Sequence, residues 1–439
     1  MSTTGRGQSL YRNAKLKIPG GTQLLTKRPE MFLPDQWPAY YSKAKGVEVW
    51  DLDGTKYTDM SYMGIGACIL GYADSDVDNA VRAAIDAGTM STLNCPEEVE
   101  LANLLCELHP WADMARYART GGEAMAVAVR LARAKTRRDK VVFSGYHGWH
   151  DWYLAANLGE SDTLDGHLLP GLEPAGVPRS LRNTAFAFEY NKLDALKTIA
   201  SKHGDEIAAI VMEPIRNLQP DPGFLEGARE VATRLKAVLI FDEVSSGWRL
   251  CVGGAHLLFG VTPDIAVFAK AMGNGYPMAA IIGKGEVMQA AQTTFISSTY
   301  WTERIGPTAA LATIGKLKRN QVWRHLIETG AKVQSGWKEA AARHELKLSV
   351  SGMPPMGHFD FKYENGQAIR TLFTQEMISK HFLATNAFYA SYAHQDVHVQ
   401  SYLKAVDETF AFIASAIRSN EVEKRLQGPV AHSGFRRLT

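Results

Sequence analysis

The chain has 439 residues, more than a single hydrophobic core usually supports, so we expect one large domain and a smaller one. Hydrophobic residues make up 46% of the chain and charged residues 21%, as in ordinary globular enzymes, which argues against a disordered or membrane-embedded chain. The formal net charge of +2 is small for this length. Charge therefore points to neither nucleic acid nor a membrane surface as a partner.

Cysteine usage and the amino-terminal segment bear on the compartment. The four cysteines are scattered, with no CxxC pair and no accompanying histidine cluster: Cys68, Cys95, Cys106 and Cys251. This spacing argues against zinc, so we expect free thiols in a reducing compartment and no metal site. Residues 1–12 are polar, and no eighteen apolar residues occur in a row. We therefore expect a cytoplasmic protein.

The first predicted element is a β-hairpin over residues 46–59. The sequence GVEVWDLDGTKYTD alternates apolar and polar residues around Asp53-Gly54, a pair that favours a tight turn. Helices are predicted next, near residues 76–86 and 96–108.

Short apolar runs and helix-length segments alternate in the middle of the chain. The runs cover residues 141–144, 207–212, 237–241 and 265–269. Buried strands separated by helices are typical of βαβ units, so an α/β fold with a large, mainly parallel sheet is predicted. Beyond residue 306 the pattern is mostly helical, with a strand-like portion at 346–361, which indicates a smaller α+β domain. The predicted parts are an N-terminal segment contributing to the small domain and to dimer contacts (1–60), the large domain (61–310) and the small domain (311–439).

A candidate anion site lies at Thr120-Gly121-Gly122. The run MAVAVRLARAK that follows has high helix propensity, so a helix begins here. Its unsatisfied N–H groups, with glycines that allow close approach and a threonine hydroxyl nearby, suit a phosphate. An ordinary N-cap with a glycine turn is the alternative explanation.

Two further candidate residues follow predicted strands. Asp242 ends the run 237–241, at the edge where open α/β sheets bind ligands, and a carboxylate there can keep a pyridine nitrogen protonated. Lys270 follows the run 265–269 and precedes a glycine-rich turn. Partial desolvation at a strand end lowers the pKa of a lysine and makes its amine nucleophilic. Taken separately, Asp242 could be a helix cap and Lys270 a surface side chain.

The order and spacing of these motifs resemble one known family. The chain is similar to class III aminotransferases of fold type I. The motifs that carry this likeness are Pro19-Gly20-Gly21, WDLDG (50–54), TGGEA (120–124), Tyr146-His147-Gly148, Met212-Glu213-Pro214, FDEVSSGWR (241–249), AKAMGNGYP (269–277) and SYAHQDV (391–397). The glutamate-1-semialdehyde aminomutases of that family resemble it most. Asp242 and Lys270, 28 positions apart, are the most specific part of the match.

The resemblance implies a pyridoxal 5′-phosphate (PLP) enzyme in which Lys270 carries the cofactor as a Schiff base and moves the substrate proton. It also implies a homodimer, in which a threonine of the neighbouring subunit reaches the phosphate. Counting back from Pro307 gives Thr302 for that position, with Thr299 as the alternative. The other implied cofactor contacts are Asp242 at the pyridine nitrogen, Tyr146 and Val244 on the two ring faces, Thr120, Gly121 and Gly122 at the phosphate, and Glu213 and Asn217 near the 3-hydroxyl.

Several positions depart from the family pattern. Gly122 lacks the hydroxyl of the family's usual Ser-Gly-Thr-Glu-Ala, for which Thr120 is a partial substitute. Three substrate positions of the aminomutases also differ. An expected arginine is replaced by Lys27 followed by Arg28, a tryptophan by Ile65 and a glutamate by Asn386. The cofactor half of the site is thus retained, and the substrate half is altered.

The predicted reaction is a ping-pong transamination from an amino donor to an aldehyde or ketone. Glutamate is the default donor by family analogy only. An isomerase, either aminomutase or racemase, is the alternative with the same cofactor. A non-catalytic scaffold is a third possibility, and intact Lys270 and Asp242 argue against it.

Overall fold

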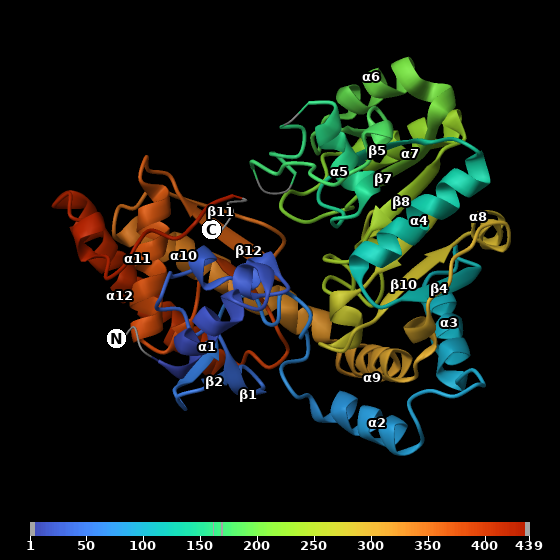
Figure 1. Ribbon diagram of the computed structural model, residues 1–439. Helices are drawn as coiled ribbons and strands as arrows, with labels where there is room; N and C mark the ends of the chain where they lie inside the picture. The colour runs from blue at the N-terminus through green and yellow to red at the C-terminus, as the bar shows by residue number, and fades with distance from the viewer. Residues whose placement is uncertain (1–4, 161, 168–169, 435–439) are drawn as a thin grey trace. The chain divides into compact units, whose positions relative to one another are not determined.

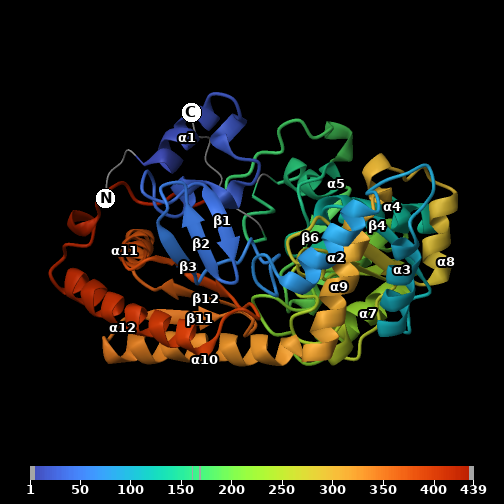
Figure 2. The ribbon, with the colours of Figure 1, turned by 90° about the horizontal axis from the view of Figure 1, so that it is seen from below.

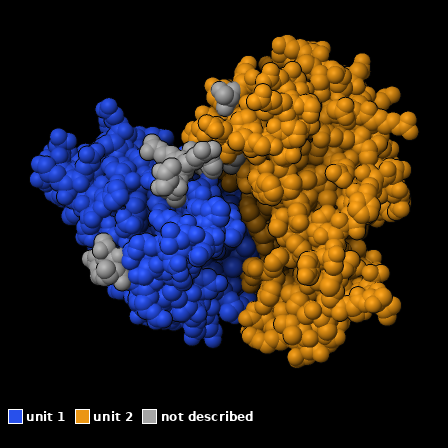
Figure 3. All heavy atoms as spheres, viewed as in Figure 1, with its two compact units in different colours: residues 1–74, 325–439 blue, residues 75–324 orange. Residues whose placement is uncertain are grey.

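The computed structural model describes residues 5–160, 162–167 and 170–434. The chain forms two compact units: residues 1–74 with 325–439 make unit 1, and residues 75–324 make unit 2 (Figure 3). The boundaries lie some residues later than the 60 and 310 expected from the sequence. Helix α9 (Ile305–Asn320) packs against α2 (Ser75–Asp86) and α3 (Pro96–Leu108), which keeps it in unit 2.

A seven-stranded sheet forms the centre of unit 2 (Figure 1). Its strands, in spatial order, are β4 (Met114–Ala118), β10 (Ala279–Gly283), β9 (Ile265–Phe268), β8 (Val238–Asp242), β7 (Ile207–Met212), β5 (Lys140–Ser144) and β6 (Ala185–Ala187). From β9 to β6 all neighbours are parallel, whereas β10 is antiparallel to both β9 and β4. The four predicted apolar runs are β5, β7, β8 and β9, which confirms the parallel α/β sheet.

Alternate residues of these strands enter two hydrophobic layers, because successive side chains point to opposite faces. Phe143, Val211 and Ile240 pack with the inner face of α4 (Gly121–Thr136). On the other face, Leu239 and Phe241 pack with residues of α6 (Leu193–His203) and α7 (Phe224–Leu235). The sheet is therefore covered on both sides, as a parallel sheet requires. The remaining unit 2 helices are α5 (Asp151–Leu154) and α8 (Gly285–Met288).

Unit 1 has two smaller sheets (Figure 2). The first contains β1 (Tyr41–Lys45), β2 (Glu48–Asp51), β3 (Lys56–Asp59) and β13 (Phe382–Leu383), and the second contains β11 (Leu348–Ser351), β12 (Met356–Phe361) and β14 (Ala387–Tyr389). Strands β2 and β3 are the predicted hairpin, with Gly54 in the left-handed region at φ 85°. The helices are α1 (Arg6–Lys15), most of α10 (Val322–Arg343), α11 (Gly366–Ser379) and α12 (Asp396–Arg418). None of the helices in the described part of the chain has the length and apolar character that a membrane crossing needs.

Candidate active site

Lys270 begins a short 3-10 helix two residues after β9 ends. Its backbone lies in the left-handed region at φ 46°, which is strained for a lysine and is a feature that clusters at functional sites. The amine donates a hydrogen bond to Oγ of the buried Ser245, 2.8 Å away. Burial, and after it the positive charge of Arg216, lowers the pKa of Lys270 to about 8. Roughly a tenth of the amine is then unprotonated at pH 7, far more than for a lysine of ordinary pKa, and the neutral amine is the form that a nucleophile or general base needs.

Asp242 lies at the carboxyl end of β8, beside β9. One carboxylate oxygen accepts from the backbone N–H of Val244 at 3.0 Å, and the other lies 2.8 Å from Nδ1 of His147. The second ring nitrogen of His147 lies 3.0 Å from the carbonyl of Ser144. Both ring nitrogens of His147 thus face oxygen atoms, which fixes the orientation of the ring beside the Asp242 carboxylate. This arrangement keeps a buried negative charge near the lysine.

Helix α4 begins at Gly121 with a complete capping box. The Thr120 hydroxyl accepts from the backbone N–H of Glu123 at 3.3 Å, and the Glu123 carboxylate accepts from the Thr120 N–H at 2.9 Å. The backbone is closely approached here: a Cβ on Gly121 would stand 3.0 Å from a Val244 methyl group. The glycines thus allow the helix start to lie against the loop that follows β8.

Tyr146 and Glu213 follow β5 and β7, and both line a cavity of about 360 Å³. Burial raises the pKa of both side chains. Arg216 lines the same cavity, and its Nη1 lies 3.4 Å from each carboxylate oxygen of Glu213. Asn217 also lines the cavity and is exposed. The site therefore combines an amine, two carboxylates, an aromatic ring and a guanidinium within unit 2.

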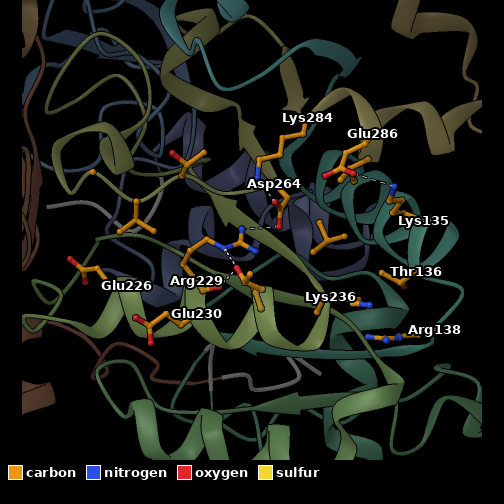
Figure 4. Close-up of a pocket in the computed structure, with 18 residues that line it drawn as sticks. Lys135, Thr136, Arg138, Glu226, Arg229, Glu230, Lys236, Asp264, Lys284 and Glu286 are labelled. Atoms are coloured by element: carbon orange, nitrogen blue, oxygen red, sulfur yellow. Dashed lines mark hydrogen bonds and ion pairs between the residues drawn. The ribbon is translucent and has the colours of Figure 1, made fainter.

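A larger cavity of unit 2, about 910 Å³, lies at the opposite sheet edge, where β8 and β9 begin (Figure 4). Asp264 accepts there from Arg229 Nη1 and Lys284 Nζ, each at 2.8 Å, and from the backbone N–H of Leu239. These contacts join helix α7, the start of β8 and the residue that follows β10. Neither Lys270 nor Asp242 lines either of these two cavities. We place the chemistry beside the smaller one, because Glu213 and Arg216 line it and their charges act on the pKa of Lys270.

Comparison with known proteins gives the class. The model of class III aminotransferases matches residues 34–389, and the chain belongs to this family. It is 34% identical over 431 residues to a 3-aminobutyryl-CoA aminotransferase of Cloacimonas acidaminovorans (strain Evry), covering 96% of this chain and 98% of the relative. It is 32% identical over 432 residues to a glutamate-1-semialdehyde 2,1-aminomutase of Dechloromonas aromatica (strain RCB), covering 93% and 99%. Among solved structures, the PLP internal aldimine form of the FumI protein of Sphingopyxis sp. MTA144 is 25% identical with a TM-score of 0.86, covering 94% and 98%.

The protein is therefore a PLP-dependent aminotransferase of fold type I. The described residues fit the cofactor. The helix start of α4 is lined by glycines where a Cβ would meet neighbouring side chains, as close approach to a phosphate requires. The Asp242 carboxylate at the end of β8 suits a protonated pyridine nitrogen, and the Lys270 amine suits an aldehyde.

The remaining predicted residues are Thr302 and the four substrate positions. Thr302 ends a short 3-10 helix in unit 2, is exposed, and donates to the Thr299 carbonyl at 3.0 Å. The four predicted substrate residues belong to unit 1: Lys27, Arg28, Ile65 and Asn386. Ile65 has φ 57°, an unusual value for a β-branched residue, and the Asn386 amide donates to the Phe359 carbonyl at 3.0 Å. Their substrate role stays a prediction.

Sequence reasoning missed Arg216, Ser245 and the role of His147 at Asp242. Arg216 directly precedes the predicted Asn217, and Ser245 follows Val244, so proximity along the chain was the available signal. The sequence could not show that these three residues act on Lys270 or Asp242, because they follow three different strands.

Proposed function

We propose that the enzyme transfers an amino group by a ping-pong mechanism in which Lys270 is the catalytic acid and base. The observation that supports this most strongly is the state of Lys270, which has a strained backbone and a partly desolvated amine. It belongs to the same unit as Asp242 and the glycines at the start of α4. PLP, when bound, supplies an electron sink for the bond that breaks at the substrate carbon. Lys270 Nζ takes the proton from that carbon and later returns it. Ser245 orients the amine through its 2.8 Å hydrogen bond.

The other side chains hold the cofactor in this proposal. Asp242 keeps a negative charge for the pyridine nitrogen, supported on its other side by His147. Tyr146 and Val244 pack on the ring faces. The backbone at Gly121 and Gly122 binds the phosphate, and Thr120 contributes by starting the helix, because its hydroxyl is already in the capping box. Glu213 and Asn217 lie on the 3-hydroxyl side.

An acidic amino donor, with glutamate as the default, fits the charge of the site. Arg216 is a partly buried cation that lines the cavity and lowers the pKa of Lys270 through its charge. Its Nη1 lies 3.4 Å from each Glu213 carboxylate oxygen, and its positive charge at the cavity suits the carboxylate of an acidic donor. Lys27 or Arg28, with Ile65 and Asn386, remain the proposed wall for the acceptor, an aldehyde or ketone.

We further propose a homodimer in the cytoplasm, with Thr302 completing the phosphate site of the partner subunit. The short helix that carries Thr302 exposes Tyr300, and the nearby Phe295 is also exposed, which supports an interface there. All four cysteines lie in the described residues and are free, which supports a reducing compartment.

A panel of amino donors tests the reaction. Purified holoenzyme is mixed with glutamate, alanine or a 3-amino acid, the last because one relative is a 3-aminobutyryl-CoA aminotransferase. Conversion of the cofactor absorbance to that of the pyridoxamine form, with release of a keto product, is the expected result. An absorbance change with no keto product from any donor would instead favour an isomerase.

The aminomutase relative makes the mutase the second candidate. We expect poor conversion of glutamate-1-semialdehyde to 5-aminolevulinate, because a mutase must hold its diamino intermediate between half-reactions. A lysine lacks the bidentate fork of an arginine, and isoleucine opens space that a tryptophan would fill. Following 5-aminolevulinate with the purified holoenzyme checks this. Efficient formation, together with inactivity toward all donor and acceptor pairs, would establish the mutase.

A further inference from the structure

Glu243 is a buried carboxylate directly after Asp242, and the proposed mechanism gives it no role. Successive side chains along an extended chain point to opposite sides, so Glu243 faces away from Asp242. Oε1 of Glu243 accepts from the backbone N–H of His256 at 2.9 Å and lies 2.9 Å from Nδ1 of its ring. Oε2 accepts from the Ser246 hydroxyl at 2.5 Å. One buried carboxylate thus joins both ends of the loop that follows β8.

The protonation of the His256 ring follows from its second contact. Trp111 donates its indole N–H to Nε2 of His256 at 2.9 Å. An indole nitrogen can only donate, so Nε2 is an acceptor and the ring proton lies on Nδ1. The neutral ring therefore donates Nδ1–H to Glu243. The hydrogen bonds run in one fixed direction, from Trp111 through His256 to the carboxylate.

A second histidine holds the same loop at Gly254. The Gly254 N–H donates to Nε2 of His109 at 2.9 Å, and Nδ1 of His109 lies 2.8 Å from the Leu105 carbonyl. Burial lowers the pKa of His109 to about 4, so this ring is neutral and its proton lies on Nδ1. A Cβ on Gly254 would stand 2.9 Å from Oε1 of Glu243. The loop is therefore packed closely onto the carboxylate.

The loop held in this way carries Ser245, the hydrogen-bond partner of Lys270. Ser245 lies between Glu243 and Ser246 in the chain, and both of these residues take part in the carboxylate contacts. The Ser245 Oγ accepts from the Lys270 amine at 2.8 Å. The backbone N–H of Glu243 donates to the carbonyl of Val267, at 2.8 Å, on the strand that leads to Lys270. The place of the Ser245 hydroxyl beside the amine thus depends on Glu243.

We propose that Glu243 is a positioning residue for the Lys270 amine. Its carboxylate, held by His256 and Trp111, fixes the loop after β8 so that the Ser245 hydroxyl stays within reach of the amine. Glu243 acts through Ser245 and is not itself a reacting group. The inference rests on the proposed function only in taking the Lys270 amine as the group that reacts with the PLP aldehyde.

The rate at which the apoenzyme captures PLP covalently tests the proposal, because this step needs the Lys270 amine and no amino donor. Ser245→Ala should slow capture by about three- to tenfold, as the loss of one hydrogen bond would. Glu243→Ala should slow it by a similar factor. The double variant should be no slower than Ser245→Ala alone, because the same orientation can be lost only once. Losses that multiply in the double variant, or an unchanged rate in Glu243→Ala, would overturn the proposal.

Two milder variants separate hydrogen bonding from charge. Glu243→Gln keeps the shape and a carbonyl oxygen that can accept from His256, so capture should return to within about twofold of wild type. Capture as slow as in Glu243→Ala would mean that the charge acts directly on the amine, which contradicts a positioning role. Trp111→Phe removes only the indole N–H and serves if Glu243→Ala does not fold. It should slow capture about two- to threefold, again without a further loss in the Ser245→Ala background.

Asp264→Ala is the matched control for stability. Asp264 is another buried carboxylate of unit 2 that accepts three hydrogen bonds, and it lies at the opposite edge of the sheet. Its loss should lower the free energy of unfolding in urea and leave the capture rate unchanged. Equal slowing in this variant would refute positioning, because general destabilisation would then explain the effect. The donor panel decides the amino-transfer reaction separately, since capture of PLP involves no donor.

Discussion

The pKa of Lys270 depends on individual neighbours that can be changed one at a time. Burial is the largest cause of its low value of about 8, and Arg216 is the next. Asp242 and Glu213 act in the opposite direction. Burial thus favours the neutral amine of Lys270, whereas the two carboxylates favour its charged form.

Arg216→Gln should raise the pKa of Lys270 above about 8, because a positive charge that disfavours protonation is removed. Covalent capture of PLP by the apoenzyme needs the neutral amine, so its rate rises with pH through this pKa, and the midpoint should move to higher pH. Stopped-flow absorbance across pH 6 to 10 measures the midpoint. Arg229→Gln, in the cavity at the far edge of the sheet, is the matched control and should leave it unchanged. A midpoint that stays or falls in Arg216→Gln would refute this.

At the scale of elements, the strands at the centre of the large sheet were predictable and those at its margins were not. Strands β5, β7, β8 and β9 are continuous apolar runs because both of their faces are buried. Strand β4 contains Arg116 and is only partly buried, and β6 has three residues, so neither has that signal. Strand β10 is fully buried, but small residues make up much of it.

The same distinction holds for the site. Asp242 and Lys270 were predictable because each follows an apolar strand. The role of Glu243 was not, because its contacts with Ser246 and His256 depend on how the loop after β8 folds. The motif TGGEA indicated a phosphate site with an ordinary N-cap as the alternative, and the structure shows the Thr120 hydroxyl in a capping box with Glu123.

The capping box gives a prediction at the scale of helix α4. Thr120→Val should lower the free energy of unfolding by about 1 kcal/mol, because an N-cap hydroxyl is lost while the shape is kept. Urea unfolding monitored by circular dichroism measures the change. Thr198→Val, whose hydroxyl donates to the Asp194 carbonyl within a helix, is a control with an exposed side chain and should have a smaller effect. An unchanged stability together with a clear loss of PLP affinity would instead assign the Thr120 hydroxyl to the phosphate.

At the scale of the whole molecule, each unit has its own sheets, and the proposed cofactor residues of one chain lie in unit 2. The predicted second sheet region at 346–361 is present as β11 and β12. The chain leaves unit 1 at residue 74 and returns to it within α10. Residues 1–60 were expected to contribute to the small domain, but a pattern of strands and helices alone does not fix the boundaries of a discontinuous unit, because contacts between distant segments define them.

The proposed homodimer makes a prediction for the assembly. Thr302→Ala should weaken PLP retention by roughly 1–3 kcal/mol if a charge-assisted hydrogen bond to the partner's phosphate is lost. Equilibrium dialysis of PLP measures this, and Thr299→Ala distinguishes the alternative donor. Sedimentation analysis should give a dimer for the wild type and both variants. A fully active monomer would contradict the shared site whatever the variants do.

The most direct test of the account is Lys270→Ala. Turnover with the best donor and acceptor pair should fall by about 10⁴-fold or more, because the only proposed acid and base at the substrate carbon is removed. The protein should still fold and bind PLP without a covalent bond, because Asp242 and the start of α4 are unchanged, and dialysis should then remove the cofactor. Wild-type turnover in the purified variant would contradict the central claim.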